Sequence, residues 1–211
     1  MTQHATPPTT GSMQWLARRI RVPLGFVTAA LYVIEVARRP AHPAAIAWSL
    51  ALVLPGLALR GFASGTVKKN RELAVSGPYA YTRNPLYLGS MLIAAGFAVA
   101  LLSWPLALLL GVGFALIYIP VIAGEEQFLR ATFPGFEDYC RCVPRLIPRF
   151  TAAKAQIGQV VAPNSPDSPS GFSLVLYRKH REYNAAIGAA LLYLSLLYLR
   201  PMLEALLHRF R

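Results

Sequence analysis

The sequence predicts an all-α integral membrane protein, built as a bundle of about five transmembrane helices. Three observations predict this class. Of the 211 residues, 55% are hydrophobic and 14% are charged, whereas about 25% of the residues in a soluble domain are charged. Several intervals as long as a membrane span carry no charged residue at all. The net charge of +12 comes from Lys and Arg residues that border these apolar intervals, which indicates membrane anchoring and not nucleic acid binding.

The first two transmembrane helices are expected within residues 18–62. They follow a polar segment, residues 1–17, that we expect to be disordered. Residues 22–37 are short for a span but have arginines on both sides, and residues 40–59 carry no charge. Glu35 lies near the end of the first span, where a carboxylate can reach the solvated interface. The alternative is a functional acid inside the membrane.

The core of the chain, residues 63–150, contains a predicted helical hairpin. No charged residue lies between Arg83 and Glu125, an interval too long for one span and long enough for two. Ser103, Trp104 and Pro105 lie near its middle, and a proline there ends one helix or starts the next. The pattern therefore predicts the third and fourth spans, joined by a tight turn.

A flexible linker is predicted over residues 151–172, which are rich in Pro, Ser and Ala. Residues 173–211 then begin as a basic interfacial segment and continue into a fifth span at about residues 183–199. If the N-terminus is cytoplasmic, few basic residues remain on the far side of the membrane: Arg38, Arg39, Arg200, Arg209 and Arg211. This asymmetry places both large polar loops in the cytoplasm, at the inner membrane if the cell is bacterial.

Polar residues gather at three places, the first of which precedes the third span. Arg83 and Asn84 come directly before Pro85, a favoured first residue of a helix. Free backbone N–H groups at a helix start bind anions and carboxylates, so a ligand carrying such groups could bind there beside Tyr79 and Tyr87. The alternative is that the arginine anchors the membrane edge and the tyrosines form an interfacial belt.

The second and third places lie after the fourth span. Glu125 and Glu126 follow it directly, where the helix dipole opposes acids, so this pair is a candidate partner for a cation. The alternative is that the helix continues and both acids are solvated. Residues 133–148 end in proline-rich sequence that predicts an extended strap across the bundle. Its Cys140 and Cys142 lack further ligands at metal-binding spacing, so we expect no metal site.

Taken together, these clusters resemble one family. The run Gly77-Pro-Tyr-Ala-Tyr-Thr-Arg-Asn-Pro-Leu-Tyr-Leu-Gly89, the apolar hairpin, Glu125-Glu126 and Val143-Pro-Arg-Leu-Ile-Pro148 occur in this order, which is similar to the isoprenylcysteine carboxyl methyltransferase and phospholipid methyltransferase superfamily. The resemblance covers residues 71–149. It implies an integral membrane enzyme that binds S-adenosylmethionine (SAM) in a cytoplasmic cofactor pocket, without a Rossmann domain.

The resemblance also implies which residues act. Arg83, Arg145 and Glu126 become candidates for catalysis, by organising the site or orienting an anionic acceptor. The family often has histidine where Asn84 stands, and its prenylcysteine-methylating members carry an arginine where Val121 stands. The second departure weighs against a prenylcysteine carboxylate as the substrate. The expected SAM contacts are Arg71, Glu72, Leu73, Ala74, Tyr79, Asn84, Pro85, Leu86, Tyr87 and Glu125.

The sequence therefore predicts a SAM-dependent methyltransferase with a lipophilic acceptor, either the carboxylate of an isoprenylcysteine-like substrate or a phospholipid amine. The acceptor, a membrane lipid or lipophilic small molecule, is expected to enter from the bilayer, and SAM from the cytoplasm. One alternative is an NADPH-dependent membrane reductase of the sterol-reductase type. Such an enzyme would need more basic residues where Glu125 and Glu126 stand, to hold a 2′-phosphate. The other alternative is a non-catalytic membrane protein.

Overall fold

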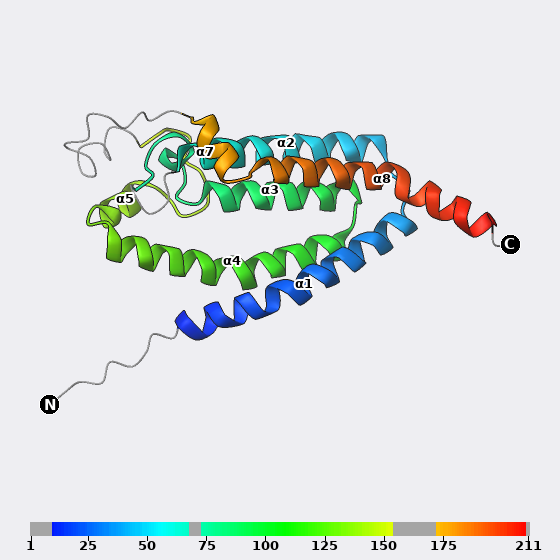
Figure 1. Ribbon diagram of the computed structural model, residues 1–211, viewed down its shortest axis with the longest axis horizontal. Helices are drawn as coiled ribbons and strands as arrows, with labels where there is room; N and C mark the ends of the chain where they lie inside the picture. Colours follow the sequence, from blue (N-terminus) through cyan, green and yellow to red (C-terminus); the bar gives the residue numbers. More distant parts are fainter. Residues whose placement is uncertain (1–9, 68–72, 154–171, 210–211) are drawn as a thin grey trace.

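The computed structural model describes residues 10–67, 73–153 and 172–209, and every regular element within these ranges is helical (Figure 1). The all-α fold is thus confirmed for the described part of the chain. Most of the predicted linker, residues 154–171, lies outside the described residues. The long helices are α1 (Thr10–Arg38), α2 (Pro43–Thr66), α3 (Pro85–Ala100), α4 (Trp104–Thr132) and α8 (Tyr183–Arg209), and the short elements are η1 (Gly77–Ala80), α5 (Phe136–Cys142) and α7 (Leu174–Lys179).

Four of these helices contain a segment long and apolar enough to cross a membrane: Trp15–Arg38, Pro43–Thr66, Trp104–Thr132 and Tyr183–Leu206. The third apolar helix, α3, has 16 residues, which is about 24 Å at the α-helical rise, against about 30 Å for the hydrocarbon core of a bilayer. Pro85 fixes its first turn, and Leu102, with a φ of 48°, lies in the turn that follows it. The predicted membrane bundle is confirmed, with a third helix shorter than the other four.

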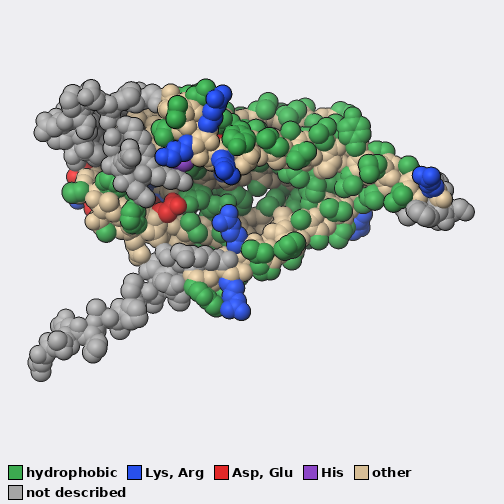
Figure 2. Space-filling view, viewed as in Figure 1, with side chains coloured by type: hydrophobic (Ala, Val, Ile, Leu, Met, Phe, Trp, Pro, Cys, Tyr) green, Lys and Arg blue, Asp and Glu red, His purple; other side chains and the backbone are tan. Residues whose placement is uncertain are grey.

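The long helices form two layers (Figure 1). α2, α3 and α8 lie in one layer, and α1 and α4 lie in the other. The α3–α4 turn lies at one end of the bundle, whereas η1, α5, α7 and the N-terminal end of α1 lie at the other end. The segments predicted to face the cytoplasm therefore gather at one end. Hydrophobic side chains cover the long helices on the face seen in Figure 2, as expected of a surface in contact with lipid.

The predicted tight turn joins α3 to α4 at Leu101–Ser103. Ser103 precedes α4 and its hydroxyl accepts a hydrogen bond from the Leu106 backbone N–H at 3.3 Å. The larger apolar core of the described residues lies at this end and takes residues from all five long helices: Val36, Val53, Phe97, Ala100, Leu101, Leu106, Ala189 and Leu196. Leu101 and Ser103 of the turn are thus buried at the point where the two layers meet, whereas the Leu102 side chain is exposed.

Two expectations for the first helix are wrong. α1 begins at Thr10, so residues 10–17 are helical and not disordered. Met13, Gln14, Leu16 and Ala17 are good helix formers, and they extend the helix beyond its apolar segment. Glu35 is not solvated, because it is only 4% exposed.

The carboxylate of Glu35 pairs with the Arg39 guanidinium at 2.6 Å. Arg39 also donates to the backbone oxygen of Leu102 at 2.7 Å. Since Leu102 lies in the α3–α4 turn, the ion pair attaches the end of α1 to that turn. A buried carboxylate is tolerated here because its partner neutralises it.

The closest helix contact in the described chain joins α2 and α3. A Cβ atom added to Gly56 of α2 would lie 2.8 Å from the Gly89 backbone oxygen, and one added to Gly89 would lie 2.7 Å from the Gly56 oxygen. The two backbones therefore approach to a distance that only glycine permits, as is common where helices associate inside membranes. This contact fixes α3, whose first turn carries Pro85, Leu86 and Tyr87 of the predicted site.

Candidate functional site

The site begins at the segment that leads into α3. Gly77 starts η1 with a φ of +58°, a conformation that favours glycine. The turn buries Tyr79 and Ala80. Asn84 then precedes α3, but its side chain does not cap the helix; its Nδ2 donates instead to the Arg145 backbone oxygen at 2.9 Å. The first-turn N–H groups of α3 are therefore not capped by this side chain.

Residues 143–153, which we call the strap, run beside residues 80–84. The Arg83 backbone N–H donates to the Pro144 oxygen at 2.9 Å, and the Ala153 N–H donates to the Ala80 oxygen at 3.1 Å. The Thr82 hydroxyl donates to the Leu146 oxygen at 3.1 Å. The extended strap was predicted from residue 133, but residues 136–142 form helix α5. No proline interrupts that stretch, and acids in its first turn favour a helix.

Glu126 joins three segments through its carboxylate and is only 4% exposed. Arg145 of the strap donates its Nε to Glu126 Oε1 at 3.0 Å and its Nη2 to Oε2 at 2.5 Å. Arg83 places its Nη1 at 3.3 Å from Oε1. The hydrogen bond to Glu126 raises the pKa of the Arg145 guanidinium. One buried acid on α4 therefore holds the α3 lead-in and the strap together.

Cys140 of α5 contacts the same cluster. Arg83 Nη1 lies 2.5 Å from Cys140 Sγ. Burial raises the pKa of the Cys140 thiol, and the positive charge of Arg83 opposes that rise. Cys140 is partly buried, and its thiol contacts the guanidinium that pairs with Glu126.

Glu125, the neighbouring acid, faces a different partner. The Tyr87 hydroxyl of α3 donates to Glu125 Oε1 at 2.7 Å, and the Tyr87 ring meets the Tyr118 ring edge-on at 4.9 Å between centroids. Tyr79 lies close by: burial, then Glu125, then Glu182 raise its pKa. The hydroxyl of Tyr139 donates to the Tyr79 backbone oxygen at 2.8 Å. Hydroxyls and a carboxylate thus meet among aromatic rings.

Many of the residues described above line one cavity of about 500 Å³, a size typical of small-molecule sites. It brings together most of the predicted residues, from segments far apart in sequence: Leu73, Ala74, Tyr79, Arg83, Asn84, Pro85, Leu86, Tyr87, Glu125 and Glu126. Val121, where the family resemblance led us to look for an arginine, also lines it. Arg71 and Glu72 lie outside the described residues. Arg145 is absent from the cavity lining; its guanidinium pairs with Glu126, and 54% of its side chain is exposed.

The sequence analysis missed several lining residues, of which Arg60 of α2 is the most informative. Its Nη2 pairs with Glu182 at 2.8 Å and its Nε with the same carboxylate at 3.1 Å. Its Nη1 donates to Ser90 of α3. Arg60 directly follows the uncharged residues 40–59, and Glu182 lies beyond the linker. Neither residue belongs to a local sequence pattern that would have identified it as part of a site.

Aromatic side chains complete the wall. Tyr118, Phe133, Phe136 and Tyr139 line the cavity together with Leu129. Phe136 and Tyr139 belong to the second apolar core of the described residues, which packs α5 and the strap against the end of α4. Within residues 10–67, 73–153 and 172–209, no group of three or more His, Cys, Asp or Glu side chains is placed to hold a metal ion.

Comparison with known proteins gives one family. Residues 47–135 match the family model described as phospholipid methyltransferase. The match begins within α2, includes α3 and α4 and stops before the strap. The similarity to this family thus lies in the segment that carries the hairpin, Tyr87 and both glutamates.

Two curated relatives are similar over 89 residues, each at 36% identity. One is a nickel-cobalt-cadmium resistance protein, NccN, of Alcaligenes xylosoxydans xylosoxydans. The other is a cobalt-zinc-cadmium resistance protein, CzcN, of Cupriavidus metallidurans. The similar segment covers 42% of this chain, 42% of the first relative and 41% of the second. No solved structure matches.

Proposed function

We propose that the protein is a membrane methyltransferase that moves the methyl group of SAM to a lipophilic acceptor, because residues 47–135 match the phospholipid methyltransferase family model. One observation carries the proposal: the cavity joins the start of α3 to Glu125 at the far end of the hairpin. These two polar places are about 40 residues apart in sequence, and the fold-back of α3 and α4 brings them together.

The residues of the cavity fit SAM. This cofactor carries a carboxylate, an ammonium group, ribose hydroxyls, an adenine and a sulfonium. The uncapped first turn of α3 suits the carboxylate, as does Arg83, whose buried Nε makes no hydrogen bond within the described chain. Glu125 can accept from the ammonium or from a ribose hydroxyl. The aromatic lining suits the adenine and the sulfonium. Leu73, Ala74, Asn84, Pro85 and Leu86 would complete the contacts.

Bound in this cavity, SAM would supply an electrophilic methyl group: an acceptor O, N or S bonds to the methyl carbon as the carbon–sulfur bond breaks and a neutral thioether leaves. The protein mainly aligns the reactants and excludes water. Tyr87 is held by Glu125 at the edge of the cavity, where it can orient the acceptor. Arg83 lines the cavity and can face an anionic acceptor. Glu126 and Arg145 act as positioning residues, because they fix Arg83 and the strap.

The lining of the cavity supports a proposal for the chemical class of the acceptor. We propose a phospholipid amine or another lipid-like substrate ahead of a prenylcysteine carboxylate, because Val121 lines the wall where an arginine would hold that carboxylate. The cavity lies at the end of the bundle that carries η1, α5 and α7, and we propose that this end faces the cytoplasm. Two glutamates in the wall disfavour the 2′-phosphate of NADPH. We therefore propose the methyltransferase ahead of the reductase.

Isothermal titration of the purified protein with SAM and with NADPH tests the cofactor. We expect heat with SAM only. Replacing Glu125 by alanine should weaken SAM binding about tenfold or more, because a charged hydrogen-bond acceptor is lost. Glu137→Ala is the matched control, since Glu137 is 55% exposed and neither it nor its partner Arg130 lines the cavity. Heat with NADPH alone, or with neither compound, would rule the proposal out.

Transfer of radiolabelled methyl from SAM into extracted native lipids identifies the acceptor. We expect a labelled lipid, and its analysis shows whether O, N or S carries the methyl group. SAM binding without any labelled product from lipids or prenylcysteine analogues would contradict a lipophilic acceptor.

A further inference from the structure

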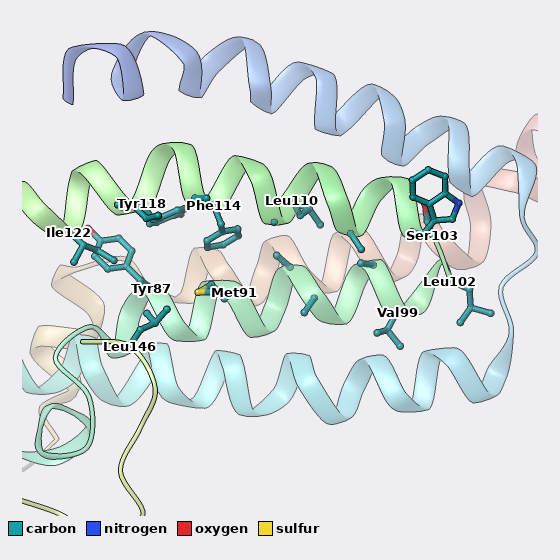
Figure 3. Close-up of a pocket in the computed structure, with 18 residues that line it drawn as sticks. Tyr87, Met91, Val99, Leu102, Ser103, Leu110, Phe114, Tyr118, Ile122 and Leu146 are labelled. Atoms are coloured by element: carbon teal, nitrogen blue, oxygen red, sulfur yellow. The ribbon is translucent and has the colours of Figure 1, made fainter. Parts of the chain in front are cut away.

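A second cavity lies beside the first one, between α3 and α4 (Figure 3). It has a volume of about 660 Å³, and its lining is almost entirely apolar. α3 contributes a stripe that includes Met91, Ala94, Ala95 and Ala98, and α4 contributes a facing stripe that includes Ala107, Leu110, Gly111, Phe114 and Ala115. Both stripes recur at helical spacing, so the cavity runs lengthwise as a groove between the two helices.

The groove is continuous with the polar cavity. Tyr87 and Tyr118 line both, and Figure 3 labels them at one end of the groove, with Leu102 and Ser103 at the other. The hydrogen bond from Tyr87 to Glu125 lies at this shared boundary. A molecule in the groove would therefore present one end to the polar cavity and keep the rest among apolar side chains.

We propose that this groove holds one hydrocarbon chain of the methyl acceptor, with the reacting group at Tyr87 and Tyr118 and the chain pointing toward Trp104. The inference rests on the proposed function and names its substrate class: a lipid that enters chain-first between α3 and α4. A single chain suits the site because one pair of helices forms its walls. The almost entirely apolar lining resembles the bilayer interior, so a hydrocarbon chain that moves there from the bilayer loses no polar contact.

Gly111 is the residue that sets the usable length of the groove. It lies midway along α4 between Tyr118 and Trp104, seven residues from each, or about 10 Å along the helix axis. A Cβ atom added to Gly111 would meet nothing within 4 Å, whereas one added to Gly113 would meet Leu24 of α1 at 2.9 Å. The space at Gly111 thus belongs to the groove and not to helix packing.

This geometry gives a matched pair of variants. Gly111→Phe places a large side chain at the middle of the groove, at a position where an added Cβ atom meets nothing within 4 Å. Gly188→Phe adds the same side chain to α8, where an added Cβ atom also meets nothing within 4 Å and where no groove residue lies. Gly111→Leu is a smaller change at the first position and should give an intermediate effect.

The experiment uses the full chain in lipid nanodiscs with a photoreactive hexadecylamine, a cationic single-chain probe. Labelled residues are mapped by mass spectrometry, and octylamine, dodecylamine and hexadecylamine compete for labelling. We expect labels on the groove faces of α3 and α4. Gly111→Phe should weaken competition by hexadecylamine about tenfold while octylamine competes as before, and Gly188→Phe should behave as the unchanged protein.

SAM titration of the same variants separates the two proposals. All three variants should bind SAM as the unchanged protein does, which also shows that they are folded. If Gly111→Phe and Gly188→Phe both bind SAM and show the same dependence of competition on the chain length of the amine, the groove is not the chain site. Labels confined to other lipid-facing surfaces would also overturn the groove proposal. Chain-dependent labelling of the groove in a protein that binds no SAM would instead overturn the proposed function and leave a hydrocarbon site.

Discussion

The two faces of α3 differ in how they meet their neighbours. Toward α2, Gly56 and Gly89 let the backbones touch, and neither could accept a single methyl group. Toward α4, small residues such as Ala94 and Gly111 leave a groove of about 660 Å³. Small side chains thus serve opposite purposes on one helix. They close an interface where the backbones converge, and they leave space where the helices are held apart.

We call the side of α3 turned toward α2 the closed face and the side turned toward α4 the open face. The open face is attached to α4 at its two ends and not along its length. At one end Glu126 and Glu125 of α4 bind the α3 lead-in, the strap and Tyr87. At the other end Ser103 caps α4 inside the buried turn. Between these attachments α3 and α4 are free to enclose a ligand. In the proposed function, the closed face would fix the cofactor site in place and the open face would give the acceptor its path.

The largest loss in the free energy of unfolding is expected where polar contacts attach the open face to α4. Glu126→Gln leaves Arg83, whose side chain is 14% exposed, without a charged partner in the cluster. Breaking a buried ion pair in this way costs about 3–5 kcal/mol. Denaturant titration in detergent micelles should show the loss. Glu137→Gln is the control, because both partners of that surface pair are about half exposed and its loss costs under about 1 kcal/mol. Similar losses in the two variants would mean that Glu126 does not hold the open face.

A smaller effect is expected on the closed face. A Cβ atom at Gly89 would lie 2.7 Å from the Gly56 oxygen, and overpacking of this kind costs about 1–3 kcal/mol. The same unfolding measurement should show Gly89→Ala destabilised and Gly111→Ala unchanged or slightly more stable, because alanine favours a helix over glycine. If both variants lost the same stability, the two faces of α3 would not differ as described.

The smallest effect is expected at the turn. Ser103→Ala removes the side chain that caps α4, which costs about 1 kcal/mol. Ser173→Ala removes a similar cap, with a longer bond of 3.4 Å, from the six-residue helix α7. We expect the first variant to lower the free energy of unfolding more than the second. The reverse order would show that the turn does not hold α4.

Much of the molecule was predictable because it follows from local chemistry. A bilayer requires long uncharged helices, so the spans follow from the spacing of charges. Ser103 to Pro105 gave the position of the hairpin turn, and Pro85 the start of α3. The two glutamates stood out because they oppose the dipole of α4. Arg83 and Asn84 were found from their place before a helix, although the strap takes the Asn84 amide.

Other features depended on contacts between distant segments. Arg60 contributes to the cavity only because Glu182, beyond the linker, meets it. Glu35 was interpreted as solvated, but packing buries it against Arg39. Arg145 was predicted to organise the site or to orient an acceptor, and only the fold pairs its guanidinium with the buried Glu126. Sequence spacing does not report which of two neighbouring charges faces a cavity.

By itself the sequence determined the class of the protein, its helical hairpin and the polar residues at both ends of that hairpin, because hydropathy and helix-start signals act over short distances. Only the tertiary structure decided that Glu125 and Glu126 turn to different partners and that a groove leads to Tyr87. The physical reason is that a cavity is the space that several packed segments leave between them, and its shape depends on all of them at once.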